Sequence, residues 1–135
     1  MTESGFRIRH DALEAIVTHA RAEAPAECCG MLVGKDASID AAVRATNIAG
    51  SPTRFLIDPK DHIDAMRAAR GRGREVLGFY HSHPQSPAWP SERDVAESAY
   101  PDAVHLIVSL AGGVVDARLF RIEEGRALHV PLDVS

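Results

Sequence analysis

The chain has 135 residues, of which 45% are hydrophobic and 25% charged, so we predict a globular protein with a single domain over residues 1–135. The formal net charge is −4, and no basic block marks the surface of a nucleic-acid-binding protein. Because no apolar run approaches the roughly 20 residues of a membrane span, we expect no membrane partner either.

Two features indicate the cellular location. Residues 1–11 lack the apolar stretch of an export signal. The cysteines, Cys28 and Cys29, are adjacent, and neighbours in a strand point to opposite faces, so we expect no disulfide between them. We therefore expect a cytoplasmic protein with reduced thiols.

Residues 11–24 predict the first helix. Their apolar side chains recur at the spacing of one helix face, at Leu13, Ile16, Val17 and Ala20. We expect Asp11 to be the N-cap of this helix. Pro25 should end it.

Three strands are predicted next, at residues 28–34, 38–48 and 55–58, with the first two joined near Lys35 and Asp36.

A second helix should then begin at Pro59, with Asp58 as its cap. We expect Ile63 and Met66 on its inner face, and Gly71 and Gly73 at its end.

The second half of the chain predicts four more strands and one helix. The strands lie at residues 75–83, 104–110, 114–122 and 126–130, the helix at 91–99, and turns at residues 111–113 and at Gly125. This order of strands and helices predicts an α/β fold, in which two or three helices pack on a mixed β-sheet.

The stretch HSHPQSPAWPSERD, residues 81–94, carries the main chemical signal. In a strand, His81 and His83 point to one side and Ser82 to the other. The prolines that follow stop the strand, and Asp94 falls in the first turn of the next helix. If the loop folds back, two imidazoles and one carboxylate can hold zinc, with a fourth position left for water.

A purely structural interpretation of the same residues is also open. Ser91 and Asp94 have the spacing of a helix-capping box, and two histidines in a strand can simply be half-buried. The whole pattern arises by chance in roughly two of a thousand such chains, which favours a metal site. The two interpretations are compatible, because a residue can cap a helix and still face a metal.

A zinc-bound water needs a base, and Glu27 stands just before the strand at residues 28–34. Its carboxylate can accept a proton from water and pass it to a leaving amine. By spacing alone Glu27 is one glutamate among several, and a solvated surface charge is the ordinary alternative.

These residues together resemble a known signature. His81-Ser82-His83-Pro84, followed after seven residues by Ser91-x-x-Asp94, is similar to the motif of the JAMM (MPN-plus) metalloproteases. Glu27-Cys28-Cys29-Gly30 resembles the Glu-x-Cys-Gly segment that carries the catalytic glutamate of that family. The order of elements is also similar, with Asn47 and residues 55–59 before a helix, so the resemblance runs from about Phe6 to about Val130.

The resemblance implies a three-layer α/β/α fold like that of cytidine deaminases, although the His-x-Glu and Pro-Cys-x-x-Cys motifs of a deaminase are missing. It implies that His81, His83 and Asp94 hold one zinc ion per chain. Glu27 would be the general base and then the general acid. Ser91 would donate a hydrogen bond to the developing oxyanion or to the bound water.

The resemblance is to the short prokaryotic branch of the family, which acts on ubiquitin-like sulfur-carrier proteins ending in Gly-Gly. We therefore expect a zinc metallopeptidase that cleaves the amide bond after that terminus and releases cysteine or a C-terminal extension. Two alternatives remain: a deubiquitinase-like isopeptidase acting on ubiquitin itself, and a non-catalytic scaffold of the MPN type.

Several residues outside the motif have two interpretations. Trp89 either lines a groove for the carrier tail or holds its own loop by packing. The run Arg67, Arg70, Arg72 and Arg74 is either a solvated helix end or a dock for an acidic carrier. The other histidines, which we assign to the surface or the core, are His10, His19, His62, His105 and His129. Cys29 is expected to be a small buried residue.

Overall fold

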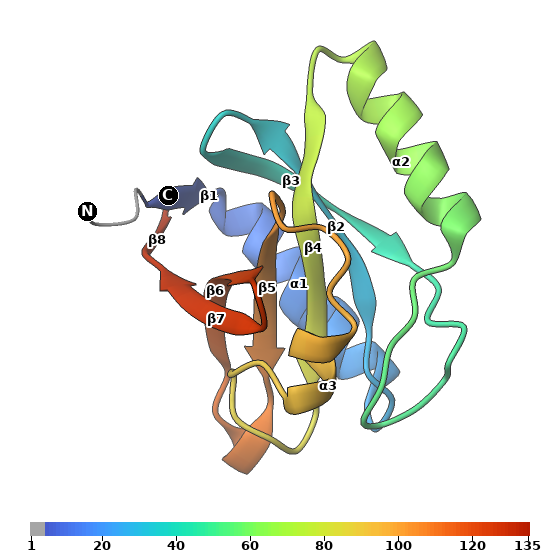
Figure 1. Ribbon diagram of the computed structural model, residues 1–135, viewed down its shortest axis with the longest axis vertical. Coiled ribbons are helices and arrows are strands. Elements are labelled where there is room, and N and C mark those ends of the chain that lie inside the picture. The colour runs from blue at the N-terminus through green and yellow to red at the C-terminus, as the bar shows by residue number, and fades with distance from the viewer. Residues whose placement is uncertain (1–4) are drawn as a thin grey trace.

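Eight strands form one mixed sheet in the computed structural model, which describes residues 5–135 (Figure 1). The first four residues, part of the predicted domain and of the stretch inspected for an export signal, lie outside the described residues. The strand order is β7-β6-β5-β4-β2-β3-β1-β8. The strands are β1 (Phe6–Ile8), β2 (Cys29–Lys35), β3 (Ser38–Ala45), β4 (Glu75–His83), β5 (Val104–Ser109), β6 (Asp116–Glu123), β7 (Arg126–Val130) and β8 (Leu132–Val134).

The sheet combines both strand orientations. β4 and β5 are parallel, as are the pairs that β1 makes with β3 and β8. The other neighbouring pairs are antiparallel. The predicted α/β fold with a mixed sheet is confirmed.

Three helices cover the two faces of the sheet: α1 (His10–Glu23), α2 (Pro59–Gly71) and α3 (Glu92–Ala96). α1 lies behind the sheet in Figure 1, whereas α3 lies in front of it. Ala65 of α2 packs on Phe79, on the face opposite α1. This is the three-layer arrangement that was expected. Among residues 5–135, no helix is both long and apolar enough to cross a bilayer.

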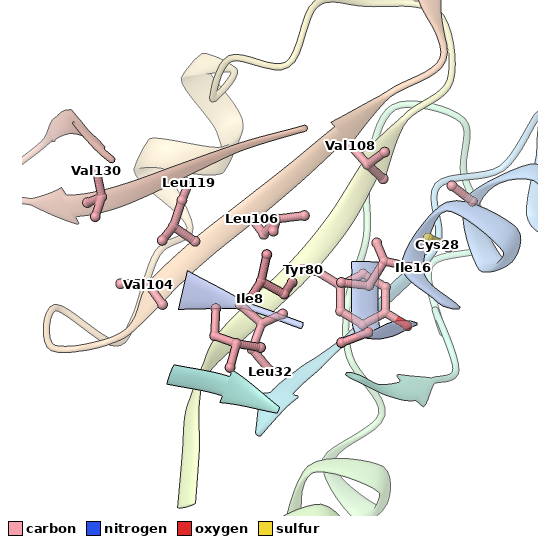
Figure 2. Packing of buried hydrophobic residues seen from close by; sticks show 13 residues of the cluster. Ile8, Ile16, Cys28, Leu32, Tyr80, Val104, Leu106, Val108, Leu119 and Val130 are labelled. Carbon is pink, nitrogen blue, oxygen red and sulfur yellow. The ribbon is translucent and has the colours of Figure 1, made fainter. Parts of the chain in front are cut away.

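The central strand β4 divides the interior into two sides, because its successive side chains point to opposite faces. Tyr80 faces α1, where it joins the main apolar cluster with Ile16 and Leu32 (Figure 2). Its hydroxyl lies 2.7 Å from Nδ1 of His19, which is therefore a core histidine. The alternate residues of β4, Phe79, His81 and His83, consequently face the side of α2 and α3.

The start of α1 differs from the prediction. The helix begins at His10, so its N-cap position is Arg9, which makes no capping bond through its side chain. Asp11 was expected to cap the helix, but it lies in the first turn and pairs with the guanidinium of Arg9 at 3.1 Å. The carboxylate still favours the positive helix end, without the geometry of a cap.

The second helix begins as predicted, but the prediction of its buried face was wrong. Asp58 caps it by accepting a hydrogen bond from the amide of Lys60. Ile63 and Met66, predicted to face inward, are exposed by 49% and 44%. The buried residues are Ala65 and Ala69. The helix therefore packs on the sheet through small side chains, and its larger apolar side chains lie outside that contact.

The segment between β3 and α2 also differs from the prediction. The strand predicted over residues 38–48 ends at Ala45, and residues 55–58 contain only one isolated bridge, between Asn47 and Ile57. Here the side chain of Asn47 replaces a regular ladder by donating to the carbonyl of Arg54 and accepting from the amide of Leu56.

Smaller differences lie at other ends of elements. The helix predicted over 91–99 is α3, which covers Glu92–Ala96. The strand predicted over 114–122 begins at Asp116. β1 and β8 were not predicted, because each has only three residues and their pairing joins opposite ends of the sequence.

Gly78 should tolerate no side chain, because a Cβ there would collide with the carbonyl oxygen of Val104 on β5. We predict that Gly78→Ala lowers the free energy of unfolding by about 2–4 kcal/mol, since the two strands would have to separate. Gly71→Ala is the matched control, because a Cβ at Gly71 meets no atom within 4 Å. It should leave stability unchanged or raise it by about 0.5–1 kcal/mol. Urea unfolding measures both, and equal effects would contradict the prediction.

Candidate metal centre

The two histidines of the motif lie at the carboxyl end of β4. Alternation along the strand turns both imidazoles toward the α3 side, and their residues are exposed by only 3% and 4%. Ser82, between them, faces the opposite way and is fully buried. Its hydroxyl accepts a hydrogen bond from the amide of Cys28 at 2.8 Å, which ties the beginning of β2 to this end of β4.

Asp94 reaches the histidines because α3 begins with a capping box. The hydroxyl of Ser91 accepts from the amide of Asp94 at 3.0 Å, and Oδ2 of Asp94 accepts from the amide of Ser91 at 2.9 Å. The same Oδ2 atom lies 3.1 Å from Nε2 of His81 and 3.1 Å from Nε2 of His83. The capping and metal-site interpretations therefore apply to the same carboxylate.

The three atoms form a nearly equilateral triangle, since the two Nε2 atoms are 3.2 Å apart. A tetrahedral zinc ion with bonds of about 2.0–2.1 Å would hold its nitrogen and oxygen ligands about 3.3 Å apart. His81, His83 and Asp94 form a group of potential metal ligands within residues 5–135. The spacing fits three corners of such a site and leaves the fourth corner to another ligand.

The protonation of His83 also fits a cation. Its Nδ1 lies 2.7 Å from the carbonyl oxygen of Pro87, which can only accept, so Nδ1 carries the proton. In its neutral form the ring presents the lone pair of Nε2 to a cation within the triangle, whereas without a cation the raised pKa of His83 favours a proton on Nε2. A lone pair facing a carboxylate is repulsive unless a proton or a metal ion lies between them.

The charges of the three groups are coupled. Burial alone would raise the pKa of Asp94, but the hydrogen bonds from His81 and His83 outweigh it and hold the pKa well below its usual range. Burial lowers the pKa of His81. For His83, burial also disfavours the charged form, but its bonds to Asp94 and Pro87 raise the pKa overall. Asp94 is therefore ionised at neutral pH and ready to bind a cation.

Neighbouring groups hold the ligands in place. Ser109 at the end of β5 donates from its hydroxyl to the carbonyl of Ser86 at 2.6 Å, which fixes the loop that carries Pro87. The ring of Phe55 stacks on His81, with centroids 4.3 Å apart and planes inclined by 19°. Both ligand rings thus have restricted orientations.

Glu27 lies beside this triangle. Cys29 pairs with His81 in the antiparallel β2–β4 ladder, so the register places Glu27 level with His83. Glu27 is 5% exposed, and its Oε1 atom is buried without a hydrogen-bond partner among residues 5–135. Burial raises the pKa of Glu27 to about 7, with a smaller contribution from Asp94, while His83 and Arg93 oppose the shift. A carboxyl group with this pKa can both accept and return a proton near neutral pH.

Ser91 is exposed at the rim of the site. Because its oxygen accepts from the amide of Asp94, its own proton remains available to a third group. The structure thus brings His81, His83 and Asp94 together, with Glu27 on one side of them and Ser91 next to Asp94.

A pocket of about 340 Å³ opens from the triangle, bounded by His81 and Asp94. Its walls are mainly apolar and aromatic, including Phe55, Ile57, Phe79, Tyr100 and Ile122. His105 also lines it and is 8% exposed, with Nε2 lacking a partner among the described residues. Burial lowers the pKa of His105 to about 4, with a further contribution from His81, so the imidazole is neutral at pH 7.

Sequence reasoning did not find this pocket. His62 and His105 were assigned to the surface or the core, yet both line it. Phe79 pairs with His105 across β4 and β5, and this parallel pairing brings the pocket together. No local signal in the sequence marks which strands become neighbours, so the pocket was not predictable from spacing.

The structure also places the other residues that had two interpretations, and it leaves both open for Trp89, which is 52% exposed. Trp89 packs edge-on against Phe120, with ring centroids 4.9 Å apart, which matches a role in holding its loop. The arginine run is exposed, which fits both of its interpretations, and Arg74 pairs with Asp40 at 2.9 Å. Cys28 and Cys29 are buried and free, as expected.

Comparison with protein families finds a match over residues 9–123 to the model of prokaryotic homologues of the JAB domain. A curated relative, the desampylase of Haloferax volcanii, is 36% identical over 98% of this chain and 100% of its own length. The CysO-cysteine peptidase of Mycobacterium tuberculosis is 33% identical over 94% of this chain and 89% of its own.

Solved structures share the fold. Protein DSY2949 from Desulfitobacterium hafniense has a TM-score of 0.89 and 28% identity, covering 96% of this chain and 92% of its own. A structure described as a metalloprotease-like zinc site in the proteasome and signalosome has a TM-score of 0.59 and 19% identity. It covers 96% of this chain and 98% of its own. At that identity the likeness shows the fold alone.

The buried imidazole of His105 should make stability depend on pH. The unfolded chain binds a proton at this group below about pH 6.5, whereas the folded chain binds it only near pH 4. Stability should therefore fall as pH decreases from 6.5 to 4, by roughly 2–3 kcal/mol from this group. We predict that His105→Gln reduces the loss between pH 7 and pH 4 by that amount, measured by urea unfolding. His129→Gln, which removes an exposed imidazole, is the control, and an unchanged pH dependence in His105→Gln would contradict the prediction.

Proposed function

The chain belongs to the family of prokaryotic homologues of the JAB domain, and from that premise we propose a specific reaction. The protein is a zinc-dependent peptidase that cleaves the amide bond after the C-terminal Gly-Gly of a ubiquitin-like sulfur carrier. In this proposal residues 1–135 belong to one domain, which carries the whole activity. The observation that carries the proposal is the triangle of His81, His83 and Asp94 with a buried, unpartnered glutamate beside it.

His81, His83 and Asp94 would hold one zinc ion per chain. Two imidazole nitrogens and one carboxylate oxygen are a donor set typical of catalytic zinc, and their 3.1–3.2 Å separations suit it. When bound, zinc supplies Lewis acidity that lowers the pKa of water at its open position to about 7.

Glu27 would move the proton. Its carboxylate accepts a proton from the attacking water and returns it to the departing amine, so one residue serves as base and then as acid. The raised pKa of about 7 suits both steps. Ser91 would donate its free hydroxyl proton to the oxygen of the scissile carbonyl as negative charge develops there.

The substrate is proposed from the relatives together with the shape of the site. The relatives' names describe cleavage of conjugates or adducts of small protein carriers, as in desampylase and CysO-cysteine peptidase. Phe55 stacks on His81 and forms part of the pocket wall beside the triangle, and a chain end without side chains could lie against this wall. The product released with the carrier is cysteine or a C-terminal extension. The two buried, free thiols fit a reducing cytoplasm as the location.

Metal content is the first test. We predict that the purified protein contains about one zinc ion per chain, measured by plasma mass spectrometry, and that zinc raises its melting temperature because it binds the folded state. His83→Ala should lose both effects. His129→Ala removes an exposed histidine outside the triangle and should keep them. A wild-type protein free of metal after zinc addition would contradict the prediction.

Cleavage is the second test. The substrates are the host's carriers ending in Gly-Gly, each extended by cysteine or a short peptide, with products identified by mass spectrometry. We predict that Glu27→Gln keeps zinc but lowers kcat by about 10²–10⁴-fold, because the base is lost while the ligands remain. Cleavage only of ubiquitin conjugates would favour the isopeptidase alternative. Zinc binding with no cleavage of either substrate would favour a scaffold.

A further inference from the structure

The side chain of Asn47 makes four hydrogen bonds that connect parts of the segment between β3 and α2, residues 46–58, to one another and to Glu27. Its Oδ1 atom accepts from the amides of Ala49 and Leu56, at 3.0 and 2.9 Å. Its Nδ2 atom donates to the carbonyls of Arg54 and Glu27, at 3.1 and 2.9 Å. The amide thus has two acceptors for its two N–H groups and two donors for its oxygen, which fixes its orientation.

The bond from Asn47 to Glu27 is one of several that fix the main chain around the proposed base. The amide of Glu27 donates to the carbonyl of Ser51 at 2.8 Å, in the same segment. On the other side, the amide of Cys28 donates to the hydroxyl of Ser82, and the carbonyl of Cys28 accepts from the amide of Ser82 at 3.1 Å. Glu27 therefore lies between a bonded loop and the strand that carries both histidines.

The carboxylate itself has no comparable support. Its Oε1 atom is buried without a hydrogen-bond partner in residues 5–135. Its position relative to His83 and Asp94 consequently depends on where the main chain of Glu27 is held. Displacing a catalytic group by about 1 Å can reduce a rate by roughly 10²-fold.

The same segment, residues 46–58, also contacts the triangle of His81, His83 and Asp94. Phe55 stacks on His81, and residues 54–57 line the pocket beside the triangle. The side-chain amide of Asn47 donates hydrogen bonds both to the carbonyl of Arg54, which is next to Phe55 in sequence, and to the carbonyl of Glu27. One side chain thus connects the wall of the site to the base.

We propose that Asn47 is a positioning residue that holds Glu27 in register with the histidine strand, an inference that rests on the proposed function. The segment has further supports that do not involve this side chain. The amide of Thr46 donates to Oδ2 of Asp61 at 2.7 Å, and the amide of Ile48 donates to the carbonyl of Leu56 at 2.9 Å. Loss of the Asn47 side chain should therefore release Glu27 without unfolding the segment.

The test uses Asn47→Asp in the full chain. Aspartate has nearly the same shape and can still accept from Ala49 and Leu56, but it cannot donate to the carbonyls of Glu27 and Arg54. We predict that kcat falls by about 10–100-fold, with KM and zinc affinity within about threefold of wild type. Independently of activity, hydrogen exchange of the Glu27 amide, followed by NMR, should accelerate at least about tenfold. Exchange of the Ser82 amide should not change.

Two further variants separate positioning from general loop stability. Asn47→Ala repeats the test without the added negative charge. Asp61→Ala removes the bond to Thr46 but leaves the bond to Glu27, so it should lower the melting temperature while kcat stays within about twofold. An equal loss of kcat in Asp61→Ala and Asn47→Asp at equal loss of stability would overturn the proposal.

Failure of the two proposals can be told apart. Unchanged exchange of the Glu27 amide in Asn47→Asp and Asn47→Ala overturns the role of Asn47, whatever the activity. Faster exchange with full kcat overturns it as well. A wild-type protein that binds zinc but cleaves no extended carrier defeats the proposed function, and the claim that Asn47 holds Glu27 is then decided by the exchange rates alone.

Discussion

The site depends on one oxygen atom, Oδ2 of Asp94. It accepts from the amide of Ser91 and lies 3.1 Å from Nε2 of each histidine. A carboxylate this close to so many positive or donating groups stays ionised, in keeping with the strongly lowered pKa of Asp94. The helix start thereby places a full negative charge at the centre of the proposed metal site. The five-residue helix α3 matters to the proposed metal site because its capping geometry directs this oxygen toward the two histidines.

The alternation of β4 allows the site and the core to coexist. Tyr80 and Ser82 belong to the α1 side, where Tyr80 joins the main apolar cluster. His81 and His83 belong to the other side, where a polar centre can form without interrupting that cluster. Ser82 then adds a cross-link to Cys28, so the strand that bears the ligands also fixes the residue after the proposed base. One strand therefore sets the positions of the ligands directly and of the base through its neighbour.

How much of the site the sequence predicts follows from how local each signal is. His81, His83 and Asp94 lie within one short stretch, and strand alternation and helix capping are local rules, so their convergence was predictable. Glu27 is different, because its position depends on the pairing of Cys29 with His81 across two strands. Its place before a strand made it a candidate, but the family resemblance was needed to single it out among the glutamates. Its assignment as the base, like that of the ligands, remains a prediction.

In the fold, too, the elements that local patterns determine were predicted, whereas those that depend on distant parts of the chain were not. The central strands and the cap of α2 were predicted from local patterns. Ile63 and Met66 were misplaced because α2 turns Ala65 and Ala69 toward the sheet, and the apolar spacing along a helix does not reveal which face meets a distant part of the chain. β1 and β8 were missed because Phe6 pairs with Leu132, at the other end of the chain. The same pairing has a consequence for the order of folding. During synthesis β1 is made before all the other strands of the sheet and β8 after them, so the two can pair only once the strands of the site are already available. This edge of the sheet should therefore be the last to close.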